Sequence, residues 1–164
     1  MKKYPLAAAI GLMAMGSVAV QAAELRFASG YPQGSITSDA LGVFEERLDE
    51  LSGGDVSVRV FELSLLNLRE TPAGIRDGMA DMGVVLTPYF PADFPHTNMV
   101  AEVSMSIELT ERGSSQAGLV YTGAMSEFIF SECTECRDEF AAQNQLFLGS
   151  AATPPYSLLC REKV

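Results

Sequence analysis

Three short segments in the first half of the chain have the hydrophobic patterns of β-strands. Residues 25–28 and 80–86 are almost continuously apolar, and residues 56–60 alternate between valine and polar side chains. Such patterns are typical of strands that are covered on one or both faces. The gaps between them are long enough for a helix, so the sequence suggests alternating strands and helices.

The first gap contains an amphipathic helix. Over residues 38–51 the apolar positions recur at helical spacing, with acidic residues elsewhere around the cylinder. We expect Thr37 or Ser38 to be its N-cap, because hydroxyl side chains accept hydrogen bonds from the first turn. The glycine pair at 53–54 follows the helix and favours its termination, since glycine adopts the left-handed C-cap conformation.

The second gap contains a shorter helix. Thr71 and Pro72 have the pattern of an N-cap followed by a proline at the first helical position, which predicts a helix that runs to about Gly78. Strand, helix, strand, helix and strand in succession are the signature of a parallel sheet. We therefore expect an α/β fold with a mostly parallel sheet flanked by helices.

The second half of the sequence has weaker periodicity. Residues 87–95 contain three prolines, so we expect an extended crossing there rather than a helix or a central strand. Helices are expected over residues 114–130 and 134–143, and closing strands over residues 146–148 and 156–160.

The N-terminus has the composition of a secretory signal. Lys2 and Lys3 precede an uncharged run over residues 6–20, which is shorter than the roughly 20 apolar residues that a membrane-spanning helix needs. Small side chains then occupy the positions that a signal peptidase requires. We expect cleavage after Ala22, which divides the protein into a signal peptide of residues 1–22 and an exported region of residues 23–164.

Charge excludes one class of partner. The sequence has 11 basic and 21 acidic residues and a formal net charge of −10. A surface of this sign repels phosphate backbones, so nucleic acid is not an expected partner. One histidine and three cysteines cannot build a Cys₄ or Cys₂His₂ zinc site, and we expect neither a metal nor a cofactor.

Cys133 and Cys136 have the spacing of a thiol–disulfide redox pair. Glu132 and Glu135 lie beside them and oppose formation of a thiolate. The structural interpretation is a disulfide, with three pairings open among Cys133, Cys136 and Cys160.

The sequence contains no recognisable catalytic motif. His96 has no orienting acid or nucleophile near it in the sequence and is interpreted as an ordinary loop residue. Ser35 follows a glycine but lacks the rest of a nucleophile elbow, and the glycine-rich phosphate-binding patterns are missing. These residues therefore give no argument for an enzyme, although they do not exclude one.

Ligand contacts are expected where the three strands end. In an open α/β sheet, ligands bind at the carboxyl ends of the strands. The loops there cover residues 29–35, 62–70 and 87–94. Their polar and aromatic members are Tyr31, Asn67, Arg69, Glu70, Thr87 and Tyr89.

Four motifs occur in a characteristic order: Leu-Arg-Phe-Ala at 25–28, Leu-Ser-Gly-Gly at 51–54, the alternating valines at 56–60, and Ile-Arg-Asp-Gly-Met-Ala-Asp-Met-Gly at 75–83. This order resembles the solute-binding proteins of tripartite ATP-independent periplasmic (TRAP) transporters, of the dicarboxylate-binding type. The resemblance implies a lobe like those of type II periplasmic binding proteins and a periplasmic location. In that family, two such lobes trap a small organic acid, often a carboxylate, for delivery to a membrane permease. The resemblance therefore implies a binding protein and not an enzyme. At matching positions, the implied ligand contacts are Gly30, Tyr31, Leu68, Arg69 and the stretch 86–89, with Thr87 and Tyr89.

Family members are longer, and the arginine that clamps the ligand carboxylate lies beyond the last residue of this sequence. Residues 62–67 also replace the usual turn after the second strand. We therefore expect residues 23–164 to be the first lobe and the start of the crossing to the second, with Arg69 as the substitute cation. We expect such a fragment to be poorly stable, with apolar surface open near residues 80–86 and 156–160. The alternatives are a small exported thiol oxidoreductase and a non-functional truncated product.

Overall fold

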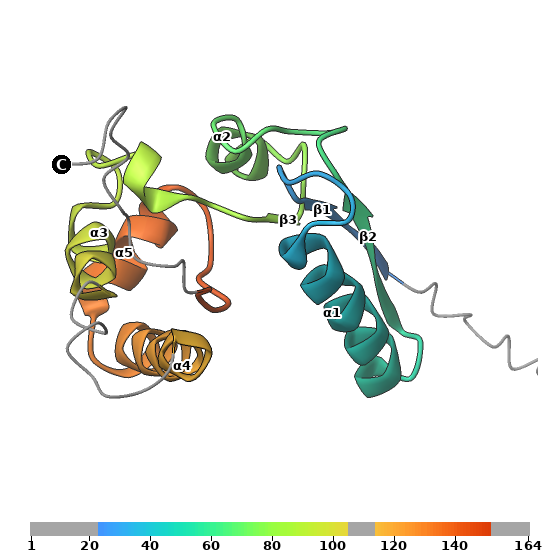
Figure 1. The fold of residues 1–164 in the computed structure, drawn as a ribbon. Helices are drawn as coiled ribbons and strands as arrows, with labels where there is room; N and C mark the ends of the chain where they lie inside the picture. Colours follow the sequence, from blue (N-terminus) through green and yellow to red (C-terminus); the bar gives the residue numbers. More distant parts are fainter. Residues whose placement is uncertain (1–22, 105–113, 152–164) are drawn as a thin grey trace, which may run out of the picture.

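The computed structural model describes residues 23–104 and 114–151. These residues form a small sheet with its own helices and a separate group of helices (Figure 1). The predicted signal peptide, residues 156–160 and Cys160 lie outside the described residues. Within these residues, no helix has the length and apolar character needed to cross a membrane.

The sheet has three parallel strands with the first strand in the centre. β1 (Ala23–Ala28) lies between β2 (Val56–Phe61) and β3 (Met82–Gly83). In the register, Ala23 pairs with Val56, and Ala28 pairs with Phe61 on one side and Gly83 on the other. The predicted α/β class, with a parallel sheet flanked by helices, is confirmed.

α1 (Ile36–Ser52) is the predicted amphipathic helix, but its N-cap is Ser35 and not Thr37 or Ser38. The Ser35 hydroxyl accepts a hydrogen bond from the Ser38 backbone N–H at 3.2 Å, so the helix begins two or three residues earlier than the apolar pattern suggests. At the other end, Gly53 has a φ of 64° and terminates the helix in the left-handed conformation, as predicted.

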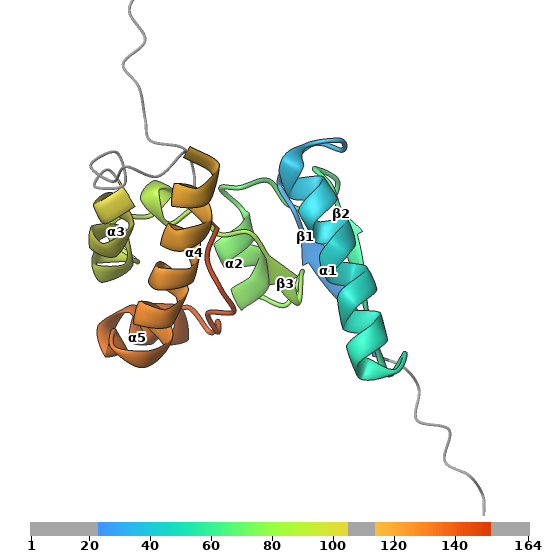
Figure 2. The ribbon, with the colours of Figure 1, turned by 60° about the horizontal axis from the view of Figure 1, so that its bottom comes forward.

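The two faces of the sheet are covered by different helices. Phe27 and its cluster partners Leu41 and Val58 are buried between the sheet and α1. The next residue, Ala28, points to the opposite face because side chains alternate along a strand. There it is fully buried in a cluster with Leu66, Ala80 and, more peripherally, Ile75 of α2. Figure 2 shows α1 and α2 on either side of the strands.

α2 (Thr71–Arg76) is present, but Thr71 is not its N-cap. The Asn67 side-chain oxygen accepts hydrogen bonds from the backbone N–H groups of Arg69 and Glu70 at 2.9 and 3.1 Å. The Glu70 carboxylate in turn accepts the Asn67 N–H at 3.0 Å, while the Thr71 hydroxyl donates back to the Asn67 carbonyl. This reciprocal capping box leads the backbone into α2, and its Asn-x-x-Glu spacing is a signal that the sequence offers.

An ion pair holds the segment before β3 against β1. The Arg26 guanidinium donates to both carboxylate oxygens of Asp81, at 2.9 and 3.0 Å, and to the Gly78 carbonyl at 3.0 Å. These hydrogen bonds lower the pKa of Asp81. The motif at residues 75–83 therefore has a structural explanation, since its aspartate anchors this segment to the central strand.

β3 is shorter than predicted. The apolar run over residues 80–86 predicts a long strand, but only Met82 and Gly83 have strand structure. The Val84 N–H still bonds to the Ala28 carbonyl at 3.2 Å, but β1 ends at Ala28 and offers no further partner. The sequence predicts open apolar surface near residues 80–86. Ala80 is instead buried, and residues 84–86 are half-buried.

Residues 87–95 do not form the extended crossing that their prolines predict. Pro88 lies in a short 3₁₀ helix, η1 (Thr87–Tyr89), and Pro95 is the first residue of α3 (Pro95–Glu102). The fixed φ of proline suits the first turn of a helix as well as an extended segment, which explains the wrong prediction.

α3 packs with α4 (Ser114–Ser131) and α5 (Thr134–Ala142), the two helices predicted in this region. Their shared core contains Ile129, Cys133 and Cys136, with Phe147 packed against it. The strand predicted over residues 146–148 is absent. The Phe147 ring instead lies 5.0 and 5.4 Å from the ring centroids of Phe130 and Phe140.

The segment after α5 ties the helical group to the sheet. The buried Gln145 side chain donates to the Pro72 carbonyl at 2.7 Å. The Arg76 guanidinium donates to the Gln143 side-chain oxygen at 3.1 Å. Both contacts reach α2, so α2 is held against the segment that follows α5.

The closest packing in the sheet generates a prediction. A Cβ added to Gly83 would lie 2.9 Å from the Ala28 carbonyl oxygen and 2.6 Å from Thr71 Cγ2. We expect Gly83→Ala to lower the free energy of unfolding by about 1–3 kcal/mol, because the backbone of β1 cannot move away. Urea denaturation of residues 23–164 measures this.

Gly42→Ala is the matched control. Gly42 lies inside α1, and a Cβ there would meet nothing within 4 Å. This substitution should leave stability unchanged or raise it by about 0.5–1 kcal/mol. Equal destabilisation by both substitutions would contradict the packing argument.

Candidate functional site

The three loops predicted to bind a ligand lie together at the carboxyl end of the sheet. Gly30 follows β1 in the left-handed conformation, with a φ of 66°. A Cβ at this position would lie 2.7 Å from Leu68 Cδ2 and 3.1 Å from the Leu68 backbone nitrogen. The loop after β1 therefore packs directly on the loop after β2, and a glycine is required for this approach.

Arg69 and Tyr89 bring the loops after β2 and β3 together. The Arg69 guanidinium carbon lies 4.8 Å from the centroid of the Tyr89 ring, a cation–π contact. The Asn67–Glu70 capping box holds the Arg69 backbone, and η1 carries Tyr89. Four of the six predicted ligand residues, Gly30, Leu68, Arg69 and Tyr89, thus contact one another in two pairs.

The other two predicted residues have structural partners. The Tyr31 backbone N–H bonds to the hydroxyl of the buried Ser29 at 3.3 Å. Thr87 is buried, and its carbonyl accepts a hydrogen bond from the Asn98 side chain at 3.0 Å, which links η1 to α3. Thr87 therefore supports the position of Tyr89.

Arg69 differs from most arginines of the described region in its partners. Arg26, Arg47 and Arg76 each form an ion pair with a carboxylate. Across residues 23–104 and 114–151, no ion pair links Arg69 to an acidic side chain. Tyr89 covers one face of the Arg69 guanidinium. The N–H donors lie in the plane of that group, in the arrangement that suits bidentate binding of a carboxylate.

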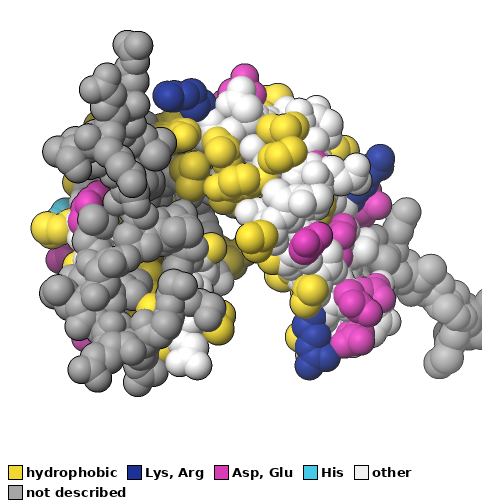
Figure 3. Space-filling view, viewed as in Figure 1, with side chains coloured by type: hydrophobic (Ala, Val, Ile, Leu, Met, Phe, Trp, Pro, Cys, Tyr) yellow, Lys and Arg dark blue, Asp and Glu magenta, His cyan; other side chains and the backbone are white. Residues whose placement is uncertain are grey.

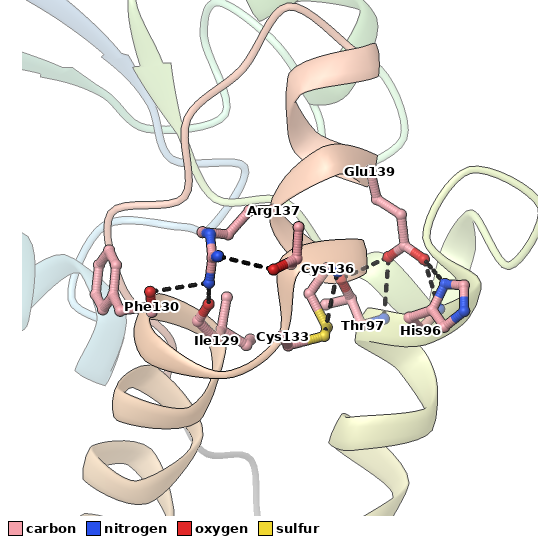
Figure 4. The surroundings of a disulfide bond; sticks show 9 residues. His96, Thr97, Ile129, Phe130, Cys133, Cys136, Arg137 and Glu139 are labelled. Atoms are coloured by element: carbon pink, nitrogen blue, oxygen red, sulfur yellow. Dashed lines mark hydrogen bonds and ion pairs between the residues drawn. A yellow bond between two sulfur atoms is a disulfide. The ribbon is translucent and has the colours of Figure 1, made fainter.

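Cys133 and Cys136 form a disulfide, which selects one of the three possible pairings (Figure 4). Cys133 is also the N-cap of α5, where its sulfur accepts the Cys136 backbone N–H at 3.1 Å. Both residues are buried. The structure gives no support to the redox alternative, because an attacking thiol needs access to these sulfurs.

Arg137 follows the disulfide and closes the end of α4. Its guanidinium donates to the carbonyls of Ile129 and Phe130 at 2.7 and 2.8 Å and to the Thr134 hydroxyl at 3.1 Å. The positive residue next to the cysteines is therefore used to cap a helix.

His96 is not the loop residue that the sequence suggested. It lies in the first turn of α3, and its Nδ1 is 2.8 Å from Glu139 Oε1 in α5 (Figure 4). The same carboxylate accepts the backbone N–H groups of His96 and Thr97 and the Thr97 hydroxyl, at 2.6, 3.0 and 2.7 Å. Glu139 thus caps α3 from another helix, a contact across 43 residues that no local pattern reveals.

Burial of Glu139 by itself would raise its pKa, but the hydrogen bonds from Thr97 and His96 outweigh burial and lower it. The carboxylate is taken up by hydrogen bonds that cap α3, and within the described ranges no three His, Cys, Asp or Glu side chains are grouped to hold a metal ion. The His96–Glu139 pair is therefore a structural contact between α3 and α5.

The sequence matches no protein-family model, and no curated protein matches it at a significant level. Among solved structures, the chain is similar to a TRAP periplasmic solute-binding protein from Desulfovibrio salexigens in an open complex. The identity is 22%, the TM-score is 0.53, and the match covers 74% of this chain and 34% of that one. The ligand-binding site of that protein holds the C-terminus of a symmetry mate.

A second similar structure is a TRAP periplasmic solute-binding protein from Rhodobacter sphaeroides in an open form without ligand. It has 23% identity and a TM-score of 0.43, with 60% of this chain and 36% of that one covered. The chain thus spans about a third of the length of these proteins. The likeness to the Desulfovibrio structure supports the fold, in which a parallel sheet is flanked by helices.

The capping role of Glu139 generates a pH prediction. Because its pKa is lower in the folded state than in the unfolded state, the carboxylate stabilises the fold fully above the ordinary glutamate range. This stabilisation is lost as the pH falls through the lowered value. We expect Glu139→Gln to reduce the free energy of unfolding at neutral pH by about 1–3 kcal/mol and to flatten its decline in acid.

Urea denaturation at several values between neutral and acidic pH measures both effects. Glu132→Gln is the control, since Glu132 is an exposed residue next to the same α4–α5 corner. If the free energy of unfolding of Glu139→Gln falls in acid as steeply as that of the unmodified protein, the carboxylate does not provide this stability.

Proposed function

We propose that this chain is part of a periplasmic solute-binding protein of a TRAP-type transporter, which captures a small organic acid for delivery to a membrane permease. The observation that carries the proposal is Arg69, stacked on Tyr89 at the carboxyl end of a parallel sheet and not paired with a carboxylate in the described region. This is the edge of an open α/β sheet where ligands bind.

The net charge makes a local cation necessary. With 21 acidic and 11 basic residues, the protein repels an approaching organic anion. A guanidinium that is held by an aromatic ring overcomes this repulsion at one place and binds a carboxylate through two parallel hydrogen bonds. The similar protein from Desulfovibrio holds the C-terminus of a symmetry mate in its ligand-binding site, and a polypeptide ends in a carboxylate.

Each member of the site has a part in this proposal. Arg69 binds the carboxylate, and Tyr89 fixes the plane of the guanidinium. Gly30 and Leu68 form the wall where two loops meet, and Tyr31 completes the rim from the loop after β1. The buried Thr87 supports Tyr89 from the loop after β3. A dicarboxylate is the expected ligand class, and binding needs no cofactor and no catalytic residue.

In the same proposal, residues 1–22 direct export to the periplasm and are removed. Residues 23–164 form the first lobe and the start of the crossing into the second. Closure of two lobes around the acid then traps it, and the closed form is what a permease recognises.

Ligand binding is tested by thermal unfolding of residues 23–164 with a panel of mono- and dicarboxylic acids. A ligand that binds only the folded state raises the melting temperature. We expect one class of acid to do so, and we expect Arg69→Gln to weaken its binding by about tenfold to a hundredfold, since a hydrogen bond to a charged group contributes about 1.5–3 kcal/mol.

Arg59→Gln is the matched control. Arg59 also stacks on an aromatic ring, with its guanidinium carbon 4.9 Å from the Phe61 centroid, but it lies within the outer strand β2 and is not one of the predicted ligand residues. This substitution should leave the shift unchanged. The proposal fails if no acid stabilises the protein, or if both substitutions reduce the shift equally.

A further inference from the structure

The outward face of α1 is divided into two stripes. One stripe is apolar and exposed: Ile36, Val43 and Leu51 have 89%, 65% and 71% of their surface accessible. The other is acidic and consists of exposed carboxylates, namely Asp39, Glu46, Asp49 and Glu50. In the part of Figure 3 that corresponds to α1, hydrophobic and acidic atoms occupy separate areas.

The apolar stripe does not belong to the core of this molecule. α1 packs on the sheet through Leu41 and Leu48, which lie about a third of a turn around the helix from Ile36, Val43 and Leu51. A surface helix normally presents polar residues to water, so apolar side chains exposed beyond the buried side indicate a second contact.

The spacing of the stripe is that of a helix-packing seam. Ile36, Ala40, Val43, Arg47 and Leu51 follow one another at steps of four or three residues. Side chains at these steps form the ridges that fit into the grooves of another helix. Ala40 leaves room for close approach, and the Arg47 guanidinium is turned to Glu50, 2.6 Å away.

The acidic stripe defines the charge of the partner. Among the described residues, no ion pair involves the carboxylates of Asp39, Glu46 or Asp49. A second copy of this protein would bring the same negative stripe to the contact, which opposes pairing of two α1 helices. A partner with lysine or arginine beside its apolar side chains satisfies both stripes.

We propose that the outward face of α1 is a docking surface for an amphipathic helix of a partner protein, whose apolar stripe is bordered by basic residues. The surface is distinct from the ligand site at Arg69, because it consists of outward-facing side chains of α1 and includes none of the predicted ligand residues.

The test uses two synthetic helical peptides of about five turns, the length of α1. Both have leucines at the same seam positions, bordered by lysines in one peptide and by glutamates in the other. Fluorescence anisotropy measures their binding to residues 23–164. We expect the lysine peptide to bind and the glutamate peptide not to bind.

Two sets of substitutions locate the contact. Val43→Ser with Leu51→Ser should weaken binding of the lysine peptide at least tenfold. Asp39→Asn, Glu46→Gln and Asp49→Asn together should weaken it about tenfold at low salt, as expected for a few exposed charge pairs. All five residues are exposed, so an unchanged melting temperature verifies that the fold is intact.

Matched controls separate this surface from general attraction to an acidic protein. Leu119→Ser with Val120→Ser removes equally apolar, exposed side chains from α4, and Glu24→Gln, Glu127→Gln and Glu132→Gln together remove three acids elsewhere. Both control sets should retain affinity within about twofold, the size of a 0.4 kcal/mol effect.

Four results would overturn the proposal: no binding of the lysine peptide, equal binding of the two peptides, equal loss in the control sets, or a dimer formed through this surface. If sedimentation detects a dimer, and Val43→Ser dissociates it, the surface binds a second copy of this protein instead. None of these outcomes depends on whether an organic acid binds at Arg69, so this proposal and the proposed function fail separately.

Discussion

The contact that the remaining structure depends on is the close approach of three backbone segments around Gly83. A Cβ at this position would lie too close to the Ala28 carbonyl and the Thr71 methyl group for a larger residue to fit without a shift. This contact, together with the Arg26–Asp81 ion pair, places β3 and α2 against the central strand. The loops of the candidate site begin or end at these elements. The geometry of the site therefore depends on the close packing that Gly83 permits.

The candidate site illustrates how a parallel sheet collects residues that are distant in sequence. Arg69 follows β2 and Tyr89 follows β3, and the two strands do not touch because β1 lies between them. Their side chains meet across the end of β1, where Gly30 lets the loops come together. Because the ring takes a face of the guanidinium and not its edge, the contact restricts the arginine without consuming its hydrogen-bond donors.

The sequence predicts β1, α1, β2, α4 and α5 because periodicity and caps are local signals. It fails for residues 84–86 and 146–148, since apolar content does not show whether a neighbouring strand exists. The polar and aromatic ligand candidates follow from the rule that loops at strand ends gather, whereas Gly30 and Leu68 rest on the family resemblance. The pairing of Arg69 with Tyr89 depends on loop conformations that no pattern encodes. Glu139 was beyond prediction for a similar reason, since its partners lie in another helix.

The central position of β1 also determines the order in which the sheet is able to form during synthesis. The first strand to emerge has two neighbours that come later, at residues 56–61 and 82–83. Until the second of these has appeared, one edge of β1 has no partner, and the Arg26 side chain lacks its aspartate, which is 55 residues away. β1, α1 and β2 can associate first, but the sheet closes only when Gly83 arrives. Folding is therefore delayed by topology, and a nascent polypeptide retains an open strand edge for most of the synthesis of the sheet.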